Sequence, residues 1–320
     1  MAPNRSDSAS SIDQTIRARV LQGIAGNRIA GVHFPGHFLG VDWQKVTADA
    51  TRVVLADGPH CRDANGSVNV AAVGVLADSA LAAPGRIGTT PGARLATIHM
   101  QLQFTGSPMT SGLYAESRLL GRSEGALRQQ SLSAATIYAS GKPVCHASGE
   151  FVLLDPPPGV TLAPMPWERT EPLAIAPVDV GNLDPREQAI LKACDAALAK
   201  ASPQASFIQH FWAGVPHRNA QGASNRVAIG PHIGNRVGHV QGGILLGLAA
   251  VNACAAAPVT MMMSNVSAWY ISPGRGAALR IRSRVVHTGR TLAVVRTEIK
   301  TVDNERVLEA VSHHVARKED

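Results

Sequence analysis

The chain has few aromatic residues and no run of lysine and arginine, and both absences bear on nucleic-acid binding. Aromatic residues make up 4% of the 320 residues, too few for an obvious platform on which bases could stack. The formal net charge is +7, but the basic residues are scattered along the chain. We therefore expect a diffuse positive surface and no nucleic-acid partner.

Cysteine is scarce, and no hydrophobic run is long enough to cross a membrane. The four cysteines form no CxxC pair and no metal-ligand spacing, so we expect neither a disulfide framework nor a metal site. The longest apolar run, at 244–257, is shorter than a membrane span and contains Asn252. The first residues lack the apolar core of a signal peptide. These features predict a cytoplasmic protein with reduced thiols and no membrane partner.

Two common signatures of catalysis are also missing. The chain has no GxSxG nucleophile elbow and no glycine-rich phosphate loop, which argues against two large enzyme classes. Hydrophobic residues make up 45% of the chain and charged residues 17%, as in soluble globular proteins. A chain of 320 residues is long enough for two domains, each with its own core.

What the chain does contain is one pattern that occurs twice. The two copies start 172 residues apart, from position 63 to position 235, and each is followed by an apolar run of helical length. The copies are Asp63-x-x-Gly66-x-x-Asn69 and Asn235-x-x-Gly238-x-x-Gln241. The repeat indicates a duplicated domain.

The two copies differ in residues that can carry chemistry. Asp78 is a lone carboxylate in the first apolar run, where the second run has Ala250. The second copy keeps a glycine pair, Gly242-Gly243, which bulkier residues replace in the first. A buried carboxylate must find a partner or a cavity, and amides at a helix start can hold developing negative charge. We predict one composite site that joins Asp78 to the glycine pair, and an inactive mirror site at Asn69 and Ala250.

Periodicity and turn residues predict the same order of elements in each half. The expected helices are 12–24, 68–83, 185–201 and 241–257, and Pro84-Gly85 is expected to end the second. The expected strands are 38–44, 51–56, 94–104, 113–120, 127–138, 144–154, 206–213, 225–229, 261–271, 278–287, 292–302 and 306–315. The helices that follow the repeated motif are apolar on almost every side, so each must be buried all round and the sheet after it must curl over it.

These motifs resemble those of tandem double-hotdog proteins in the acyl-CoA thioesterase superfamily. The phenylacetate-type branch has the pattern Asn-x-x-Gly-x-x-His-Gly-Gly, and this chain has Gln241 in place of that histidine. The branch also has an acidic residue nine positions after the histidine, as Asp78 stands nine positions after Asn69 in the first copy. The resemblance implies an α+β fold of two tandem hotdog domains, each an antiparallel sheet wrapped around a central apolar helix, with the sheets joined edge to edge. The expected parts are an N-terminal polar segment and helix at 1–30, domains at 31–155 and 181–320, and a proline-rich linker at 156–180.

The resemblance also implies a reaction, which is hydrolysis of an acyl-CoA thioester to the free acid and CoA without a metal or other cofactor. Asp78 would activate water or attack the thioester directly. The amide of Gly242 would polarise the carbonyl group. Gln241 and Asn235 would position the reacting groups.

Three more residues are candidates for substrate binding. Gly243 lets a ligand approach the backbone closely. Arg280 and Arg282 share one face of an expected strand and could meet CoA phosphates, although a solvated sheet face is the commoner explanation for such a pattern. Hotdog proteins commonly pair, so the resemblance also allows a homo-oligomer.

Two other functions stay open at this point. One is a non-catalytic acyl-CoA-binding protein, and the other is a hotdog enoyl-CoA hydratase or dehydratase. The segment 33–38 is similar to the histidine motif of the dehydratases, but there the motif leads into the central helix and here two strand-like segments intervene. The discriminating question is whether the Asp78 carboxylate and the Gly242 amide face one cavity.

Overall fold

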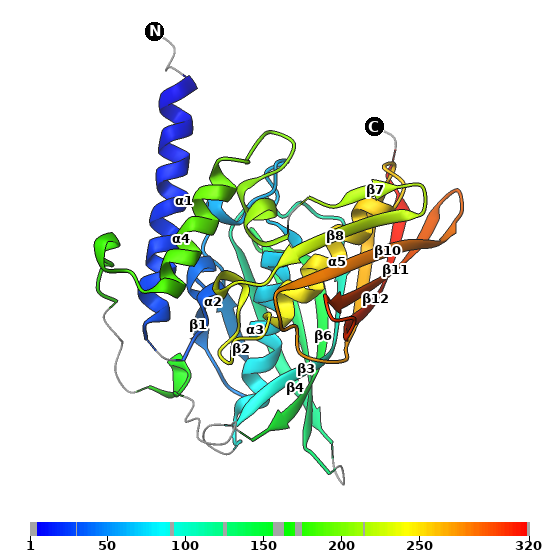
Figure 1. Cartoon of the computed structure of the whole chain (residues 1–320). Helices are drawn as coiled ribbons and strands as arrows, with labels where there is room; N and C mark the ends of the chain where they lie inside the picture. The colour runs from blue at the N-terminus through cyan, green and yellow to red at the C-terminus, as the bar shows by residue number, and fades with distance from the viewer. Residues whose placement is uncertain are drawn as a thin grey trace.

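Figure 1 shows the computed structural model of the chain, which describes residues 5–29, 31–89, 93–123, 127–155, 163–169, 175–213 and 215–318. Its strands in the first half are β1 (Asp42–Lys45), β2 (Thr51–Val54), β3 (Arg94–Phe104), β4 (Leu113–Arg122), β5 (Gln130–Ala139) and β6 (Lys142–Leu154). Those in the second half are β7 (His217–Asn219), β8 (Gly222–Ala228), β9 (Met261–Tyr270), β10 (Ala278–Thr288), β11 (Leu292–Thr301) and β12 (Arg306–Ala316).

All twelve strands join in one antiparallel sheet. Their order is β1-β2-β4-β5-β6-β3-β9-β12-β11-β10-β8-β7, so each half contributes one side of the sheet. The two sides meet where β3 pairs with β9, with Met100 opposite Ala268. The expected α+β fold and the edge-to-edge junction are confirmed, and neither half is left with an open edge at the centre.

Two apolar helices, α3 (Val70–Arg86) and α5 (Gly242–Ala256), lie side by side on this sheet (Figure 1). α3 contacts β2 to β6 and α5 contacts β7 to β12, so each half of the sheet curls around its own helix. A Cβ atom on Gly74 would lie 2.4 Å from the carbonyl oxygen of Gly243. The missing side chains therefore let the two helix backbones touch.

α3 does not end at Pro84-Gly85 as predicted but continues to Arg86. Proline lacks the N–H that would donate to the carbonyl oxygen of Ala80 four residues earlier. The hydroxyl of Ser117 on β4 donates to that oxygen instead, at 2.6 Å. A side chain from the neighbouring strand thus replaces the lost helical hydrogen bond, and the last turn carries Arg86 into the region of Asp78.

The predicted strand at 38–44 is wrong in its first part, where the chain forms the short helix α2 (Phe34–Leu39). Pro35 lies in the first turn, where a missing N–H does no harm, and His33 Nδ1 accepts a hydrogen bond from the backbone N–H of Gly36 at 3.0 Å. Gly40 ends the helix in the left-handed conformation, with φ of 60°. Only β1 keeps the predicted extended form.

The predicted strand at 206–213 is also wrong, because this segment is helical and includes a π-helical turn at Gln209–Ala213. Phe207 and Phe211 are four residues apart, which places both on one helical face. Both pack on Phe38 of α2, and the ring centroids of Phe38 and Phe211 are 5.3 Å apart. This aromatic contact between the two halves overrides the local strand pattern.

The other helices pack at the side of the molecule away from β12. α1 (Arg5–Asn27) contains the predicted helix 12–24 and extends beyond it, and it packs beside α4 (Pro185–Leu198) (Figure 1). Four short 3-10 helices complete the helical elements described: Pro59–Cys61, Pro166–Glu168, Val180–Asn182 and Pro231–Ile233. None of the helices in the described ranges is long and apolar enough to cross a membrane.

The predicted proline-rich linker is described only in part, because 156–162 and 170–174 lie outside the described residues. Residues 163–169, which we call the linker strap, pack against the body of the protein. Met165 is 8% exposed, and the ring of Trp167 lies 5.3 Å from that of Trp43 on β1. The strap is therefore a packed segment of the linker, held by apolar contacts with the body of the protein.

Candidate active site

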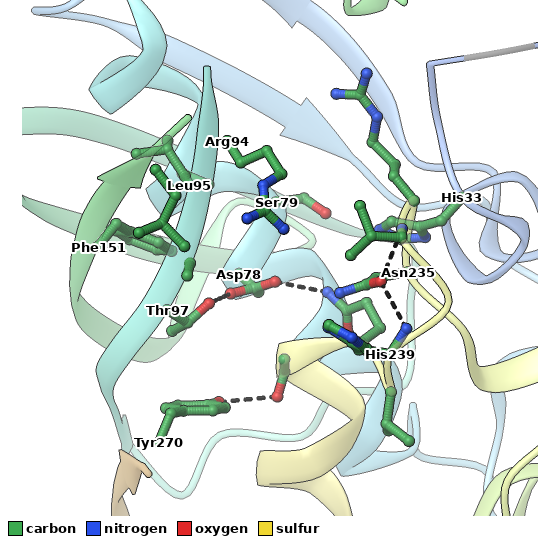
Figure 2. Close-up of a pocket in the computed structure, with 18 of the residues that line it drawn as sticks. His33, Asp78, Ser79, Arg94, Leu95, Thr97, Phe151, Asn235, His239 and Tyr270 are labelled. Carbon is green, nitrogen blue, oxygen red and sulfur yellow. Dashed lines mark hydrogen bonds between the residues drawn. The ribbon is translucent and has the colours of Figure 1, made fainter. Parts of the chain in front are cut away.

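Asp78 lies on α3 and borders a cavity of about 440 Å³. One carboxylate oxygen, Oδ1, accepts a hydrogen bond from Thr97 Oγ1 at 2.8 Å. The other, Oδ2, accepts one from Gln241 Nε2 at 2.6 Å (Figure 2). The structure therefore brings a carboxylate from the first half of the chain together with a side chain from the second half.

Gln241 is held in one orientation by its second hydrogen bond. It is the N-cap of α5, and its Oε1 accepts from the backbone N–H of Ile244 at 2.9 Å. Because the oxygen of the amide caps the helix, the nitrogen must point at Asp78, and the two ends of the side chain cannot be exchanged. Gln241 thus presents a fixed donor to the carboxylate.

Gly242 is the first residue of α5 and faces the same pair of groups. A Cβ atom at this position would lie 3.0 Å from Thr97 Oγ1 and 3.3 and 3.4 Å from the two Asp78 oxygens. The backbone N–H of Gly242 has no acceptor among the described residues, as expected for the first turn of a helix. Tyr270 donates its hydroxyl to the Gly242 carbonyl oxygen at 2.8 Å and holds this turn in place.

The electrostatics of Asp78 suit a group that exchanges a proton near neutral pH. Burial raises its pKa from the ordinary value of 3.8 to about 6. The Thr97 hydrogen bond, the charge of Arg86 and the backbone N–H of Gly243 act in the opposite direction and limit the rise. The carboxylate is ionised at pH 7 but remains a competent base.

Asn235 lines the cavity but makes its side-chain hydrogen bonds within its own turn. Its Oδ1 accepts from the backbone N–H groups of Val237 and His239, both at 3.0 Å (Figure 2). This is the Asx-turn geometry of a residue that shapes a loop. Asn235 therefore sets the path of the chain that leads to Gln241, and the structure shows no direct contact with Asp78.

Three residues expected to bind substrate lie elsewhere. Gly243 does not line the cavity, because a Cβ atom there would be 2.2 Å from the carbonyl oxygen of Gly74 in the helix contact. Arg280 and Arg282 are exposed on β10, whose alternate side chains point inward to α5, so they lie on the outer face of the sheet. Strand alternation thus separates both arginines from the cavity that holds Asp78.

The mirror position has the local geometry of a helix cap. Asn69 Oδ1 accepts from the backbone N–H of Ala71 at 2.8 Å, and its Nδ2 donates to Asp63 Oδ1 at 2.6 Å. Ala250 is fully buried on α5. The two residues supply a cap and a methyl group where the other site has an amide and a carboxylate.

Thr97 was not foreseen from the sequence. A β-bulge between Thr97 and His99 interrupts the pairing of β3 with β6 and adds Ile98 to one strand only. Such a bulge changes which way the neighbouring side chains point, and here the Thr97 hydroxyl reaches Asp78. A bulge has no clear signature in a single sequence, so only a threonine at the start of a central strand could have hinted at this role.

Thr97→Val is expected to lower kcat for the reaction of this site by about tenfold, because it removes one donor to the carboxylate while keeping the side-chain volume. The loss of that donor also raises the pKa of Asp78, so the acidic limb of the pH profile should move to higher pH. Thr97→Ser keeps the hydroxyl and should retain the wild-type profile. An unchanged profile in Thr97→Val would show that the hydroxyl does not tune Asp78.

Comparisons with known proteins fit this geometry. A family model described as the acyl-CoA thioesterase N-terminal domain matches residues 232–314, which carry Gln241 and Gly242. No curated protein sequence matches the chain. Residues 232–314 are thus similar to an acyl-CoA thioesterase domain.

Solved structures extend the likeness to nearly the whole chain. A hot dog fold protein of unknown function from Alicyclobacillus acidocaldarius is 9% identical, covers 88% of this chain and 96% of its own, and has a TM-score of 0.50. A Lactobacillus plantarum protein provisionally described as an oleoyl thioesterase is 10% identical, with 91% and 98% covered and a TM-score of 0.49. An acyl-ACP thioesterase from Bacteroides thetaiotaomicron is 10% identical, with 83% and 97% covered and a TM-score of 0.48. The fold is that of tandem hotdog proteins, as the sequence motifs imply.

Proposed function

We propose that this protein hydrolyses an acyl-CoA thioester to the free acid and CoA at the composite site between its two halves. The observation that carries the proposal is the meeting of three groups at one cavity: the Asp78 carboxylate, the Gln241 amide and the unpartnered backbone N–H of Gly242. A base and an oxyanion donor next to one cavity are the minimal parts of an acyl-transfer site. The acyl-CoA thioesterase-type domain at 232–314 supports the choice of thioester.

In the proposed reaction, Asp78 acts as a general base on water. As the water oxygen bonds to the thioester carbon, Asp78 takes one of its protons, and the Gly242 N–H donates to the carbonyl oxygen on which negative charge develops. When the intermediate collapses, the C–S bond breaks and the proton moves from Asp78 to the departing sulfur. The products are the carboxylic acid and the thiol of CoA.

Direct attack by Asp78 on the thioester is the other route that such a carboxylate can take. Both carboxylate oxygens already accept a hydrogen bond, from Thr97 and from Gln241, which weakens them as nucleophiles. We therefore favour the base over the nucleophile. One turnover in ¹⁸O-labelled water should place the label in the product acid and leave Asp78 unlabelled.

The hydratase alternative needs a histidine that exchanges protons beside the carboxylate. His33 lines the same cavity, but its Nδ1 is held by the backbone N–H of Gly36 at 3.0 Å. Burial, together with the charges of His37 and Arg236, lowers the pKa of His33 to about 3. His33 therefore stays neutral and poorly suited to proton transfer. His239 also lines the cavity, but in the described part of the chain its side chain makes no hydrogen bond to Asp78, so the arrangement favours hydrolysis over hydration.

The test is hydrolysis of a panel of short, long and aromatic acyl-CoA esters by the full chain, followed by release of free thiol. At least one ester should be cleaved, and log(kcat/KM) should rise with pH up to about pH 6 and then level off, because Asp78 must be ionised to accept a proton. Absence of hydrolysis across the panel would contradict the proposal and leave acyl-CoA binding without catalysis as the better account.

A further inference from the structure

The cavity that holds Asp78 has an excess of positive charge. Arg86, Arg94 and Arg236 all line it, and Asp78 is the sole carboxylate among the described lining residues. Arg94 lies above Asp78 in the view of Figure 2. In the described part of the chain, no carboxylate lies within ion-pair distance of any of these three guanidinium groups. Within the described residues their charge is offset only at longer range, by Glu168 near Arg86 and Arg236 and by Asp78 near Arg86.

Arg86 is the most confined of the three. It follows Asp78 by eight residues on α3, which puts both on one helical face about 12 Å apart along the axis. Its Nη1 donates to the carbonyl oxygen of Ala93 at 3.0 Å, a neutral partner. Burial lowers the pKa of Arg86 to about 10, and the like charge of Arg236 acts in the same direction. A cation kept in such a place needs an anion to match it.

Arg236 is held at the cavity by neutral groups as well. Its Nη2 donates to the carbonyl oxygen of Ala163, and its Nη1 contacts Sδ of Met165 at 3.0 Å, both in the linker strap. Burial lowers its pKa, and the charge of Glu168 raises it. These contacts fix the position of the guanidinium without cancelling its charge.

The internal repeat shows that these two arginines occur at the composite site that contains Asp78 and not at the equivalent positions of the mirror site. At the repeat distance of 172 residues, Arg86 corresponds to Pro258 and Arg236 to Ala64, just as Asp78 corresponds to Ala250. The mirror site, which has Ala250 in place of the carboxylate, therefore has Pro258 and Ala64 where the site at Asp78 has Arg86 and Arg236. Arg86 also lowers the pKa of Asp78, which weakens it as a base.

We propose that the substrate's acyl group carries a carboxylate at its far end, which Arg86 binds with Arg236 while Asp78 acts on the thioester. This inference rests on the proposed thioester hydrolysis and names its substrate class, a dicarboxylic acyl thioester. Leu95, Phe151 and Leu154 line the same cavity and supply apolar contacts for the methylene chain between the two ends. Since Arg86 and Asp78 are about 12 Å apart along the axis of α3, we expect a spacer of several methylene groups between the two ends.

The experiment compares adipoyl-CoA with hexanoyl-CoA, which have the same number of carbons and differ in the terminal carboxylate. The wild type should prefer adipoyl-CoA in kcat/KM by about tenfold or more. Arg86→Met should lower kcat/KM for adipoyl-CoA by about 10²-fold, because a buried charge then lacks its partner, and change that for hexanoyl-CoA little. Arg118→Met, at an exposed position of β4 that does not line the cavity, is the matched control and should leave both values unchanged.

The phosphates of CoA are a second source of negative charge that the arginines could bind. S-adipoyl and S-hexanoyl pantetheine lack these phosphates, so they distinguish binding of the acyl carboxylate from binding of the phosphates. If the preference for the adipoyl ester persists with pantetheine and depends on Arg86, the acyl carboxylate is the ligand. The inference is overturned if the wild type does not distinguish adipoyl-CoA from hexanoyl-CoA. It is also overturned if Arg86→Met weakens both CoA esters equally and neither pantetheine ester.

Binding to Asp78→Asn, measured by calorimetry, tests anion recognition without turnover. Tighter binding of adipoyl-CoA than of hexanoyl-CoA, lost on adding Arg86→Met, would support the inference even if no ester were hydrolysed. Equal binding of the two esters would overturn it even if hydrolysis were found. Failure of the proposed function and failure of the inference are thus separate results.

Discussion

Asp78→Asn is expected to lower kcat for thioester hydrolysis by about 10³-fold, on the scale that a positioned general base contributes. An asparagine amide cannot take a proton from water at neutral pH. It can still accept the hydrogen bond from Gln241 Nε2 and offer its own N–H to the Thr97 hydroxyl, so the geometry of the site should survive. The measurement is release of free thiol from the best ester of the panel.

The same substitution should make the protein more stable at pH 7. The pKa of Asp78 is higher in the folded protein than in the unfolded chain, so the folded state binds more protons between about pH 4 and pH 6. The free energy of unfolding of the wild type therefore falls as the pH rises through this window. Asp78→Asn removes this dependence, and we expect a gain of up to about 3 kcal/mol at pH 7 and almost none near pH 4.

Urea unfolding at both pH values measures this difference, and Asp303→Asn is the matched control. Asp303 is an exposed carboxylate in the turn after β11, so the same chemical change there should alter neither activity nor stability. Loss of both activity and stability in Asp78→Asn would identify Asp78 as a structural residue. Gain of stability with loss of activity is the signature of a buried charge kept for its chemistry.

Gly242→Ala is the second substitution with a large expected effect. The added methyl group would lie 3.0 Å from Thr97 Oγ1 and 3.3 and 3.4 Å from the Asp78 oxygens, in the space where water must meet the carboxylate. We expect kcat to fall by about 10² to 10³-fold, the scale for loss of oxyanion stabilisation. Alanine is the better helix former by about 1 kcal/mol, which partly offsets a cost of about 1 to 3 kcal/mol for these tight contacts, so the protein should stay folded.

Gly121→Ala is the control for this variant. A Cβ atom on Gly121 has open space around it, so this change should leave hydrolysis intact. If Gly242→Ala kept near wild-type kcat, the first turn of α5 would not be where the carbonyl oxygen of the thioester is held. A fall in kcat with unchanged KM would indicate that the methyl group acts on the reaction step and not on substrate binding.

The central elements of the fold were readable from the sequence because they obey simple patterns. The two apolar runs at 68–83 and 241–257 have no polar face, and only burial inside a curled sheet accommodates such helices. The segments 38–44 and 206–213 were misassigned because they are short and because their phenylalanines pack on each other across the two halves, a contact that no local pattern encodes. Tertiary contact decided the local structure there.

The candidate site was likewise predictable from the sequence only in part. The repeat predicted one composite site that joins Asp78 to the glycine pair, since complementary losses in two copies imply a shared site, and the family resemblance added Gln241. Thr97 and Arg86 were not predicted, for physical reasons. A β-bulge sets the direction of the Thr97 side chain, and α3 continues as far as Arg86 because Ser117 on β4 replaces a helical hydrogen bond. Both depend on partners distant in sequence.

The pairing of β3 with β9 has a consequence for how this protein could evolve. In a dimer of identical chains, every substitution at such a junction appears on both sides of the symmetry axis at once. Here the two sides are encoded separately, so a change at Asp78 leaves Ala250 untouched, and a change at Arg86 leaves Pro258 untouched. Joining the two halves in one chain thus allows the site at Asp78 and its mirror site to differ in charge, although each draws residues from both halves.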